Sequence, residues 1–394
     1  MPTGGDTPRT YHVVPLSMII LILFSAEWAV RMAVQLLLRE QGASLLIVSM
    51  SSTMCWIGAL LGGVVWGRLA DLRHARPLMH IVTAGTAASI GSLALLSSAA
   101  GALTLSFIRN LVVSGSNPII LALISRNDVK ARRERDLPTA VASRSLGGVV
   151  GLIGVGFLLG RLGSHRTFVS LAAWSLIALG LVTLGIKQRI NHWEGSATQG
   201  GSPPTAATRR PPMYRLLLAT VLRQMAISGT GSLIYIYMGT LSISPGWMGV
   251  TSALCPGIQV ISLLCLGRLA NRLGRRAMFL LGFALSAAAP AIYALASSAP
   301  EMAVGFVVSG IGFGSMYLGT ALYVGDVTPM QRHGQMFGLY EASLALGGAL
   351  GPVISGSIAD VVGLRNMLWV MAGLGALSVI SALSQNTTGS KHNT

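Results

Sequence analysis

The sequence predicts an all-α membrane protein whose twelve transmembrane helices form two pseudo-symmetric six-helix bundles. Three observations predict this fold class: an apolar composition, twelve apolar runs of membrane-spanning length, and an internal repeat spaced by 200 residues. Of the 394 residues, 52% are hydrophobic and only 10% are charged, whereas soluble domains carry about 25% charged residues. The 48 glycines favour close packing of helices in lipid. This composition excludes a soluble enzyme, a disordered chain and a disulfide-rich secreted domain.

The net charge of +16 does not indicate a nucleic-acid-binding protein. Lysine and arginine cluster in short segments between the apolar runs, which is the pattern of a membrane protein. The cysteines, Cys55, Cys255 and Cys265, lie within apolar runs and show no metal-binding spacing. We therefore expect no metal site and no nucleic-acid partner.

Twelve apolar runs follow one another along the chain, and each bilayer crossing needs about 20 such residues. The first run is too long for a signal peptide and carries Glu27 and Arg31 in its middle, so we expect it to be retained. The predicted helices lie near residues 13–38, 44–69, 78–98, 102–125, 139–160, 166–186, 214–239, 245–268, 277–297, 302–325, 335–359 and 366–384.

The distribution of basic residues predicts the orientation of these helices. With a cytoplasmic N-terminus, the outer segments contain only Arg39, Arg161, Arg166 and Arg365, and most other basic residues lie inside. Both termini are therefore expected in the cytoplasm. A stretch rich in Gly, Ser and Pro has the composition of a linker and separates the two halves. The expected organisation is a cytoplasmic tail at 1–12, a six-helix bundle at 13–189, a cytoplasmic linker at 190–213, a second six-helix bundle at 214–384 and a tail at 385–394.

A shift of 200 residues brings the two halves into register. GRLAD at 67–71 aligns with GRLAN at 267–271, and LGGVVGLIGVG at 146–156 aligns with LGGALGPVISG at 346–356. Parallel six-helix repeats are typical of secondary transporters. The glycines of the longer motif predict a close-packing surface on the fifth helix.

On these residues the chain resembles the major facilitator superfamily of secondary transporters over about residues 13–384. The family's loop between helices two and three runs approximately G-x-L-a-D-r-x-G-r-r. The segment 67–71 matches its start, and GRLANRLGRRAM from Gly267 matches its basic tail but carries Asn271 in place of the acid. The resemblance implies the major facilitator fold, alternating access, and a central cavity lined by helices 1, 4, 7 and 10.

The resemblance also implies a gating role for this loop motif. Asp71 is expected to accept hydrogen bonds from the N-terminus of helix eleven, where the dipole favours an anion, and so to hold one access state. Gly67 and Gly267 are expected at close helix contacts. The alternative is that the loop arginines only anchor the helices on the cytoplasmic side. The predicted gating residues are Gly67, Arg68, Asp71, Arg76, Gly267, Arg268, Asn271, Arg275 and Arg276.

Glu27, Arg31 and Arg109 are the main candidates for substrate and proton coupling. Glu27 and Arg31 lie one turn apart on the first helix, and Arg109 lies on the fourth helix at a similar depth. Charges inside a bilayer are costly, so they pair or face water. Protonation of Glu27 would release an arginine, and the substrate would favour one protonation state. The alternative is a static ion triad that fixes helix packing, because two neighbouring arginines resist protonation of a carboxylate.

Polar side chains on helices seven and ten are expected in the substrate cavity, namely Gln224, Tyr235 and Tyr317. Such groups bind sugars, aromatic compounds or amphipathic drugs, and the alternative is that they only fill a helix interface. Arg144 and Glu341 occupy nearly equivalent positions in the two halves, where a gate or packing role is expected. Arg223 is expected to extend toward the cytoplasmic face.

The expected function is secondary active transport of a small organic solute, with proton-coupled efflux of drugs or metabolites as the first hypothesis. The alternatives are a sugar or other small-solute transporter, working by efflux or proton symport, and a non-transporting membrane receptor. No catalytic cluster indicates an enzyme. No cofactor is expected, and without a G-x-x-x-x-G-K-[ST] motif the proton motive force is expected to drive transport. The expected partners are a small-molecule substrate and the lipid bilayer, for a monomer in the cell (inner or plasma) membrane.

Overall fold

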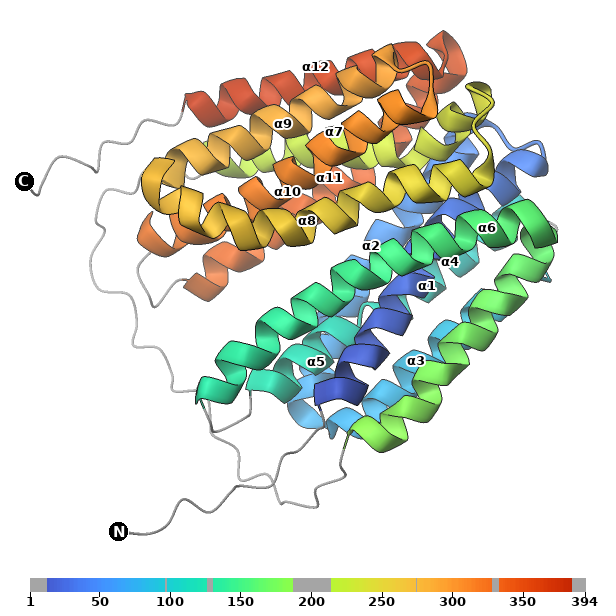
Figure 1. Ribbon diagram of the computed structural model, residues 1–394, viewed down its shortest axis with the longest axis vertical. Coiled ribbons are helices and arrows are strands. Elements are labelled where there is room, and N and C mark those ends of the chain that lie inside the picture. The colour runs from blue at the N-terminus through green and yellow to red at the C-terminus, as the bar shows by residue number, and fades with distance from the viewer. Residues whose placement is uncertain are drawn as a thin grey trace, which may run out of the picture. The chain divides into compact units, whose positions relative to one another are not determined.

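In the part of the chain that it describes, the computed structural model is built from α-helices (Figure 1). It describes residues 13–95, 98–125, 130–186, 214–273, 275–327 and 333–384, so the predicted tails and linker lie outside the described residues. The helices are α1 (Val13–Glu40), α2 (Leu45–Leu72), α3 (Ala75–Leu93), α4 (Ala99–Val113), α5 (Ser116–Ser125), α6 (Lys130–Gly185), α7 (Tyr214–Thr240), α8 (Pro245–Leu273), α9 (Arg275–Leu295), α10 (Ala299–Val327), α11 (His333–Val362) and α12 (Leu364–Leu383).

Two predicted boundaries fall differently in the structure. The predicted fourth helix is divided into α4 and α5 by a turn at Ser114 and Gly115. The predicted fifth and sixth helices are the two arms of α6, which meet at Gly163, where φ is 73° and ψ is 174°. Gly363, 200 residues later, has a φ of 85° between α11 and α12. A glycine adopts this left-handed backbone without a steric penalty, so the same turn recurs in both halves.

Among the described residues, nine helical segments are long and apolar enough to cross a membrane. One of the nine, Thr139–Gly185, has 47 residues and covers both arms of α6. At about 1.5 Å per residue it is long enough for two crossings of a core about 30 Å thick. Helices α3 and α8 are not among the nine. The all-helical membrane fold is therefore confirmed, while the count of twelve spans is not fully confirmed.

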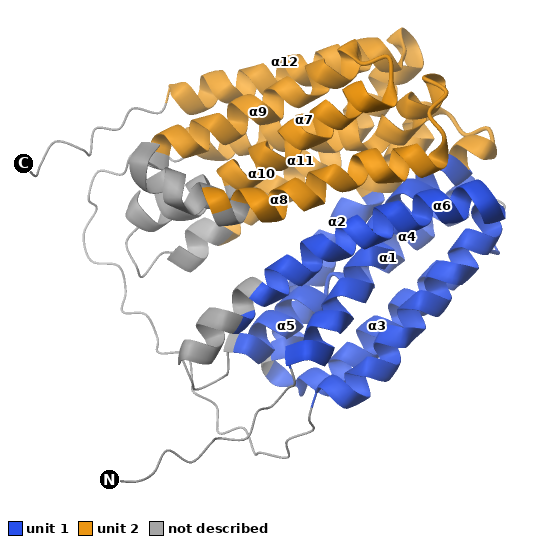
Figure 2. Ribbon diagram, viewed as in Figure 1, with its two compact units in different colours: residues 1–37, 54–191 blue, residues 38–53, 192–394 orange. Residues whose placement is uncertain are grey.

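The chain forms two compact units (Figure 2). Unit 1 contains residues 1–37 and 54–191, and unit 2 contains residues 38–53 and 192–394. Apolar side chains of α1, α2, α3, α5 and α6 form the main core of unit 1. Those of α7, α9, α10 and α12 form a core in unit 2.

The repeat is visible in equivalent contacts at the helix ends. His165 Nδ1 on the second arm of α6 bonds to the carbonyl oxygen of Ala94, just after α3, at 2.6 Å. Arg365 Nε at the start of α12 donates to the carbonyl oxygen of Ala294 near the end of α9 at 2.7 Å. Both residues of the second contact lie 200 positions after those of the first. A terminal carbonyl that has no partner within its own helix is satisfied in the same way in each unit.

Glycines of the fifth-helix motif allow close helix contacts in both units. A Cβ on Gly151 in α6 would collide with the backbone of Ser25 in α1, and a Cβ on Gly351 in α11 would collide with the backbone of Met225 in α7. These pairs are also related by 200 residues. The predicted close-packing surface is therefore found at Gly151 and recurs in unit 2, whereas Gly154, which was expected to belong to it, has no close neighbour.

We expect Gly151→Ala to destabilise the protein, because the added methyl group has no space. Overpacking of this kind costs about 1–3 kcal/mol. Gly154→Ala is the matched control, since a Cβ on Gly154 meets nothing within 4 Å, and alanine is about 0.5–1 kcal/mol better than glycine inside a helix. Thermal unfolding midpoints in detergent should fall for the first variant and not for the second. A fall of the same size in both would contradict this packing.

The turn between α7 and α8 holds a serine in the left-handed region, since Ser242 has a φ of 56°. The equivalent position between α1 and α2 is Gly42, with a φ of 76°. We expect Ser242→Gly to stabilise the protein. The substitution relieves about 1–2 kcal/mol of backbone strain in the folded state. It costs about 0.4–1 kcal/mol because glycine gives the unfolded chain more conformational freedom, so the gain is larger than the cost. Gly42→Ser should do the opposite. Unfolding midpoints that move in the reverse directions would contradict this account.

Candidate functional site

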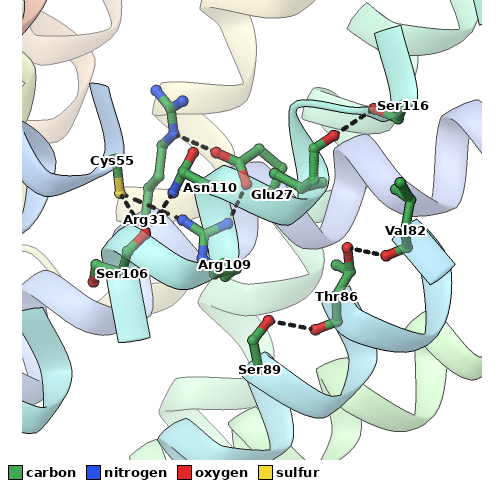
Figure 3. Close-up of polar contacts among 11 residues, drawn as sticks. Glu27, Arg31, Cys55, Val82, Thr86, Ser89, Ser106, Arg109, Asn110 and Ser116 are labelled. Atoms are coloured by element: carbon green, nitrogen blue, oxygen red, sulfur yellow. Dashed lines mark hydrogen bonds and ion pairs between the residues drawn. The ribbon is translucent and has the colours of Figure 1, made fainter. Parts of the chain in front are cut away.

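A cluster of ion pairs lies within unit 1, between α1 and α4 (Figure 3). Glu27 and Arg31 are one turn apart on α1, and Arg31 Nε donates to Glu27 Oε1 at 3.0 Å. The other carboxylate oxygen, Glu27 Oε2, forms an ion pair with Arg109 Nη1 of α4. The structure thus brings together the three charged residues that the sequence singled out.

The two arginines of this cluster differ in exposure. The side chain of Arg109 is 2% exposed and that of Arg31 is 44% exposed, while that of Glu27 is 8% exposed. Arg109 Nη2 also donates to Cys55 Sγ of α2 at 3.6 Å. Arg31 instead lies beside the Trp28 ring, 5.9 Å from its centroid. Arg109 is therefore the fixed partner of Glu27, and Arg31 is the partner that solvent or a ligand can reach.

Close contact between α2 and α4 positions Arg109. A Cβ on Gly58 or Gly62 of α2 would collide with the backbone of α4. Trp66 Nε1 on the same helix donates to the carbonyl oxygen of Leu111 at 2.8 Å. Small residues let the two backbones approach, and this approach places Arg109 beside Cys55 and Glu27.

The chemistry available here depends on the carboxylate that both arginines share. With Glu27 ionised, the cluster carries a net charge of +1. If a proton neutralises Glu27, or a cationic ligand replaces an arginine, then Arg31 loses its partner while Arg109 stays buried. Because Arg31 is the exposed member, its departure from Glu27 is less costly than that of Arg109. The cluster can therefore link the charge state of Glu27 to the position of Arg31.

Comparison with known proteins identifies the family. A family model described as Major Facilitator Superfamily matches residues 16–258 and 216–394. The chain belongs to this superfamily. It is 22% identical over 341 residues to the Multi-drug resistance efflux pump PmrA of Streptococcus pneumoniae, covering 84% of each protein. It is also 24% identical over 140 residues to the MFS-type transporter TwmF of Talaromyces wortmannii, and this match spans 36% of the chain and 25% of that protein.

The solved nucleoside transporter NupG has the same fold as this facilitator. The TM-score is 0.77 at 12% identity, over 95% of this chain and 98% of that chain. At this identity the likeness concerns the fold alone. Family and fold together establish a multi-pass membrane transporter and confirm the resemblance found in the sequence.

The facilitator loop motif is only partly described. Arg68 is exposed, and a Cβ on Gly67 would meet nothing within 4 Å among the described residues. The expected close contact is thus not found at Gly67, because Gly58 and Gly62 form the face of α2 that meets α4. The side chains of the other predicted gating residues on this loop and its repeat, and so the predicted helix-eleven latch, lie outside the described residues: Asp71, Gly267, Arg268, Asn271 and Arg275.

Arg76 and Arg276 of the same motif have equivalent partners in the two units. Arg76 Nη2 donates to the carbonyl oxygen of Thr183, close to the end of α6, at 3.2 Å. Arg276 Nη2 donates to the carbonyl oxygen of Leu383, the last residue of α12, also at 3.2 Å. Arginines that bind the carbonyl ends of helices stabilise them. These contacts favour the anchoring interpretation for both arginines.

The predicted cavity residues of helices seven and ten lie in unit 2. Gln224 and Tyr235 of α7 are both buried, and a Cβ on Gly347 of α11 would collide with Gln224. Gln224 therefore lies at a helix contact. The side chain of Tyr317 lies outside the described residues. A shared cavity for these residues and the Glu27 cluster stays a prediction.

Arg144 and Glu341 take different environments. The Arg144 guanidinium of α6 stands 4.7 Å from the centroid of the Phe24 ring of α1, which is a cation–π contact within unit 1. Glu341 of α11 is exposed. The contact with Phe24 favours the packing role for Arg144.

In unit 2, the sequence did not predict the burial of Arg223, and it did not single out Asp360. Arg223 does not extend into solvent as expected: it is 3% exposed, and its Nε donates to Ser286 Oγ of α9 at 2.8 Å. Asp360 of α11 accepts hydrogen bonds from the backbone N–H groups of Leu45 and Leu46, at 2.9 Å and 3.0 Å. It therefore caps the N-terminus of α2. The available signal for Asp360 was an acid close to the end of a span.

Proposed function

We propose that this facilitator is a proton-coupled exporter of small organic solutes, either drugs or metabolites. The observation that carries the proposal is the position of Glu27, which is buried in a membrane helix between one fixed and one exposed arginine. A buried carboxylate in a membrane helix marks a functional site more often than a structural one. The name of the relative PmrA, a multi-drug resistance efflux pump, supports the substrate class and direction.

The mechanism rests on competition for Glu27. In one state the carboxylate is ionised and holds Arg31 and Arg109. Protonation frees Arg31, and the resulting pair of positive charges favours a rearrangement of the cluster. Substrate binding favours one of these states, so the proton gradient shifts the population of the two access states. Arg109 stays in place throughout, because Cys55 and α4 hold it.

The proposed exporter has cytoplasmic termini, uses the proton motive force and works as a monomer. The distribution of basic residues supports cytoplasmic termini in the inner or plasma membrane. The proton motive force supplies the energy, with no ATP site and no cofactor. The two six-helix repeats support a working monomer, since one chain contains both halves of the pathway.

The test uses purified wild-type protein in liposomes with an imposed pH gradient. Labelled amphipathic cations, sugars and amino acids are added one class at a time. We expect the gradient to drive accumulation of an amphipathic compound. Accumulation of a sugar instead would support the alternative of a sugar transporter. Equilibration of a compound with no response to the gradient would contradict proton coupling.

A further inference from the structure

Unit 2 contains a buried cation that no carboxylate of the described chain neutralises. Arg223 of α7 is 3% exposed and makes a single hydrogen bond with described residues, from Nε to Ser286 Oγ. Neither of the ion pairs found among the described residues involves it. The ionisable groups that act on its charge are Tyr340 of α11 and Cys255 of α8. A phenol and a thiol are neutral near pH 7, so the positive charge of Arg223 stays unbalanced.

The terminal nitrogens of Arg223 are available to a ligand. Within the described part of the chain, neither Nη1 nor Nη2 has a hydrogen-bond partner. The described polar atoms that lack both a hydrogen-bond partner and solvent exposure do not include Nη1 or Nη2. Each of these two nitrogens therefore keeps some access to solvent. Ser286 Oγ accepts from Nε and itself donates to the carbonyl oxygen of Gly282 at 2.6 Å, which fixes the hydroxyl. The guanidinium is therefore held through Nε, while Nη1 and Nη2 have no hydrogen-bond partner among the described residues.

The internal repeat shows which group unit 2 lacks. The positions 200 residues after Glu27, Arg31 and Arg109 are Ile227, Gly231 and Ser309. The carboxylate that neutralises a buried arginine in unit 1 is thus replaced by Ile227, one turn from Arg223 on α7. Unit 2 has a buried cation of its own but no equivalent of Glu27. A buried charge without a partner is costly, and a bound anion would remove that cost.

We infer that Arg223 is an anion-binding point inside unit 2. Its ligand is a small anion, either the carboxylate of a transported solute or an inorganic ion such as chloride, which accepts hydrogen bonds from Nη1 and Nη2. Two parallel N–H donors on a planar guanidinium suit a carboxylate. The inference goes beyond the proposed function, because it depends neither on Glu27 nor on proton coupling.

Thermal unfolding of the full chain in detergent tests this inference. The sodium salt of 2-(N-morpholino)ethanesulfonate, a bulky anion without a carboxylate, is replaced stepwise by sodium chloride or sodium acetate at constant ionic strength. We expect the wild-type midpoint to rise with chloride or acetate concentration, as for any ligand that binds the folded state. Arg223→Met should show no rise, and in the sulfonate its midpoint should equal or exceed that of the wild type. Arg223→Lys keeps the charge and should keep part of the rise.

Arg365→Met is the matched control. Arg365 also donates through Nε, to the carbonyl oxygen of Ala294, but it is exposed, so this variant should keep the full rise. A rise with acetate alone would assign the point to a solute carboxylate, and a rise with chloride would assign it to a small inorganic anion. The inference is overturned if the wild-type midpoint does not change with the anion, if Arg223→Met keeps the full rise, or if Arg223→Met is less stable than the wild type in the sulfonate.

Discussion

Arg109→Leu is expected to destabilise the protein by about 3–5 kcal/mol, the usual cost of removing one partner from a buried ion pair. Glu27 would remain 8% exposed and would keep only Arg31, whose side chain is 44% exposed. Leucine also cannot replace the hydrogen bond from Arg109 to Cys55. The measurement is the free energy of unfolding in mixed micelles.

Two further variants separate the charge effect from general damage. Arg166→Leu removes an exposed arginine from the same unit and should change stability by less than about 0.5 kcal/mol. The double variant Glu27→Leu with Arg109→Leu removes both charges of the buried pair and should recover much of the loss, since apolar replacements of a buried pair are often tolerated. An Arg109→Leu variant as stable as Arg166→Leu would contradict the buried ion pair.

Glu27→Gln is expected to abolish accumulation driven by the pH gradient while leaving substrate exchange intact. Glutamine has nearly the same shape as glutamate but neither ionises nor takes up a proton. Residue 27 is then neutral at every pH, as protonated Glu27 would be. The pH gradient therefore cannot change the charge of the cluster. The measurement compares gradient-driven accumulation with exchange of labelled substrate in the same liposomes, and the exchange shows that the variant is folded.

Glu301→Gln is the matched control for this prediction. Glu301 is exposed in the first turn of α10 and accepts hydrogen bonds from Ser297 N and Ser298 Oγ, both at 2.8 Å. Its loss should weaken a helix N-terminus without affecting coupling. If Glu27→Gln kept gradient-driven accumulation at the level of Glu301→Gln, the triad would be a packing feature.

The Glu27 cluster could be predicted from the sequence because much of it depends on the spacing of residues within one helix. Residues four apart on a helix are neighbours, so the contact between Glu27 and Arg31 follows from spacing alone. Arg109 needed two more steps, a depth counted from the helix ends and the family resemblance. The different exposure of the two arginines could not be predicted, since it depends on how α1 and α4 rotate against α2.

The dependence of exposure on helix packing also explains what the sequence did not predict in unit 2. Arg223 lies in an apolar run near the end that the sequence predicts to be cytoplasmic, and a long flexible side chain there would have a route to water. Only the packing of α7 against α9 and α11 shows that Arg223 is buried instead. Similarly, Gly151 and Gly154 look alike in the motif, yet a Cβ is blocked at the first position and free at the second. Such differences are set by the neighbouring helix.

If Glu27 carries the coupled proton, substrate should evoke proton movement that depends on Glu27. Liposomes containing a trapped pH dye receive a pulse of transported substrate, with wild-type or Glu27→Gln protein in the membrane. We expect a change of internal pH with the wild type and none with the variant, although labelled substrate still exchanges in both. An equal change of internal pH in the two preparations would contradict the account.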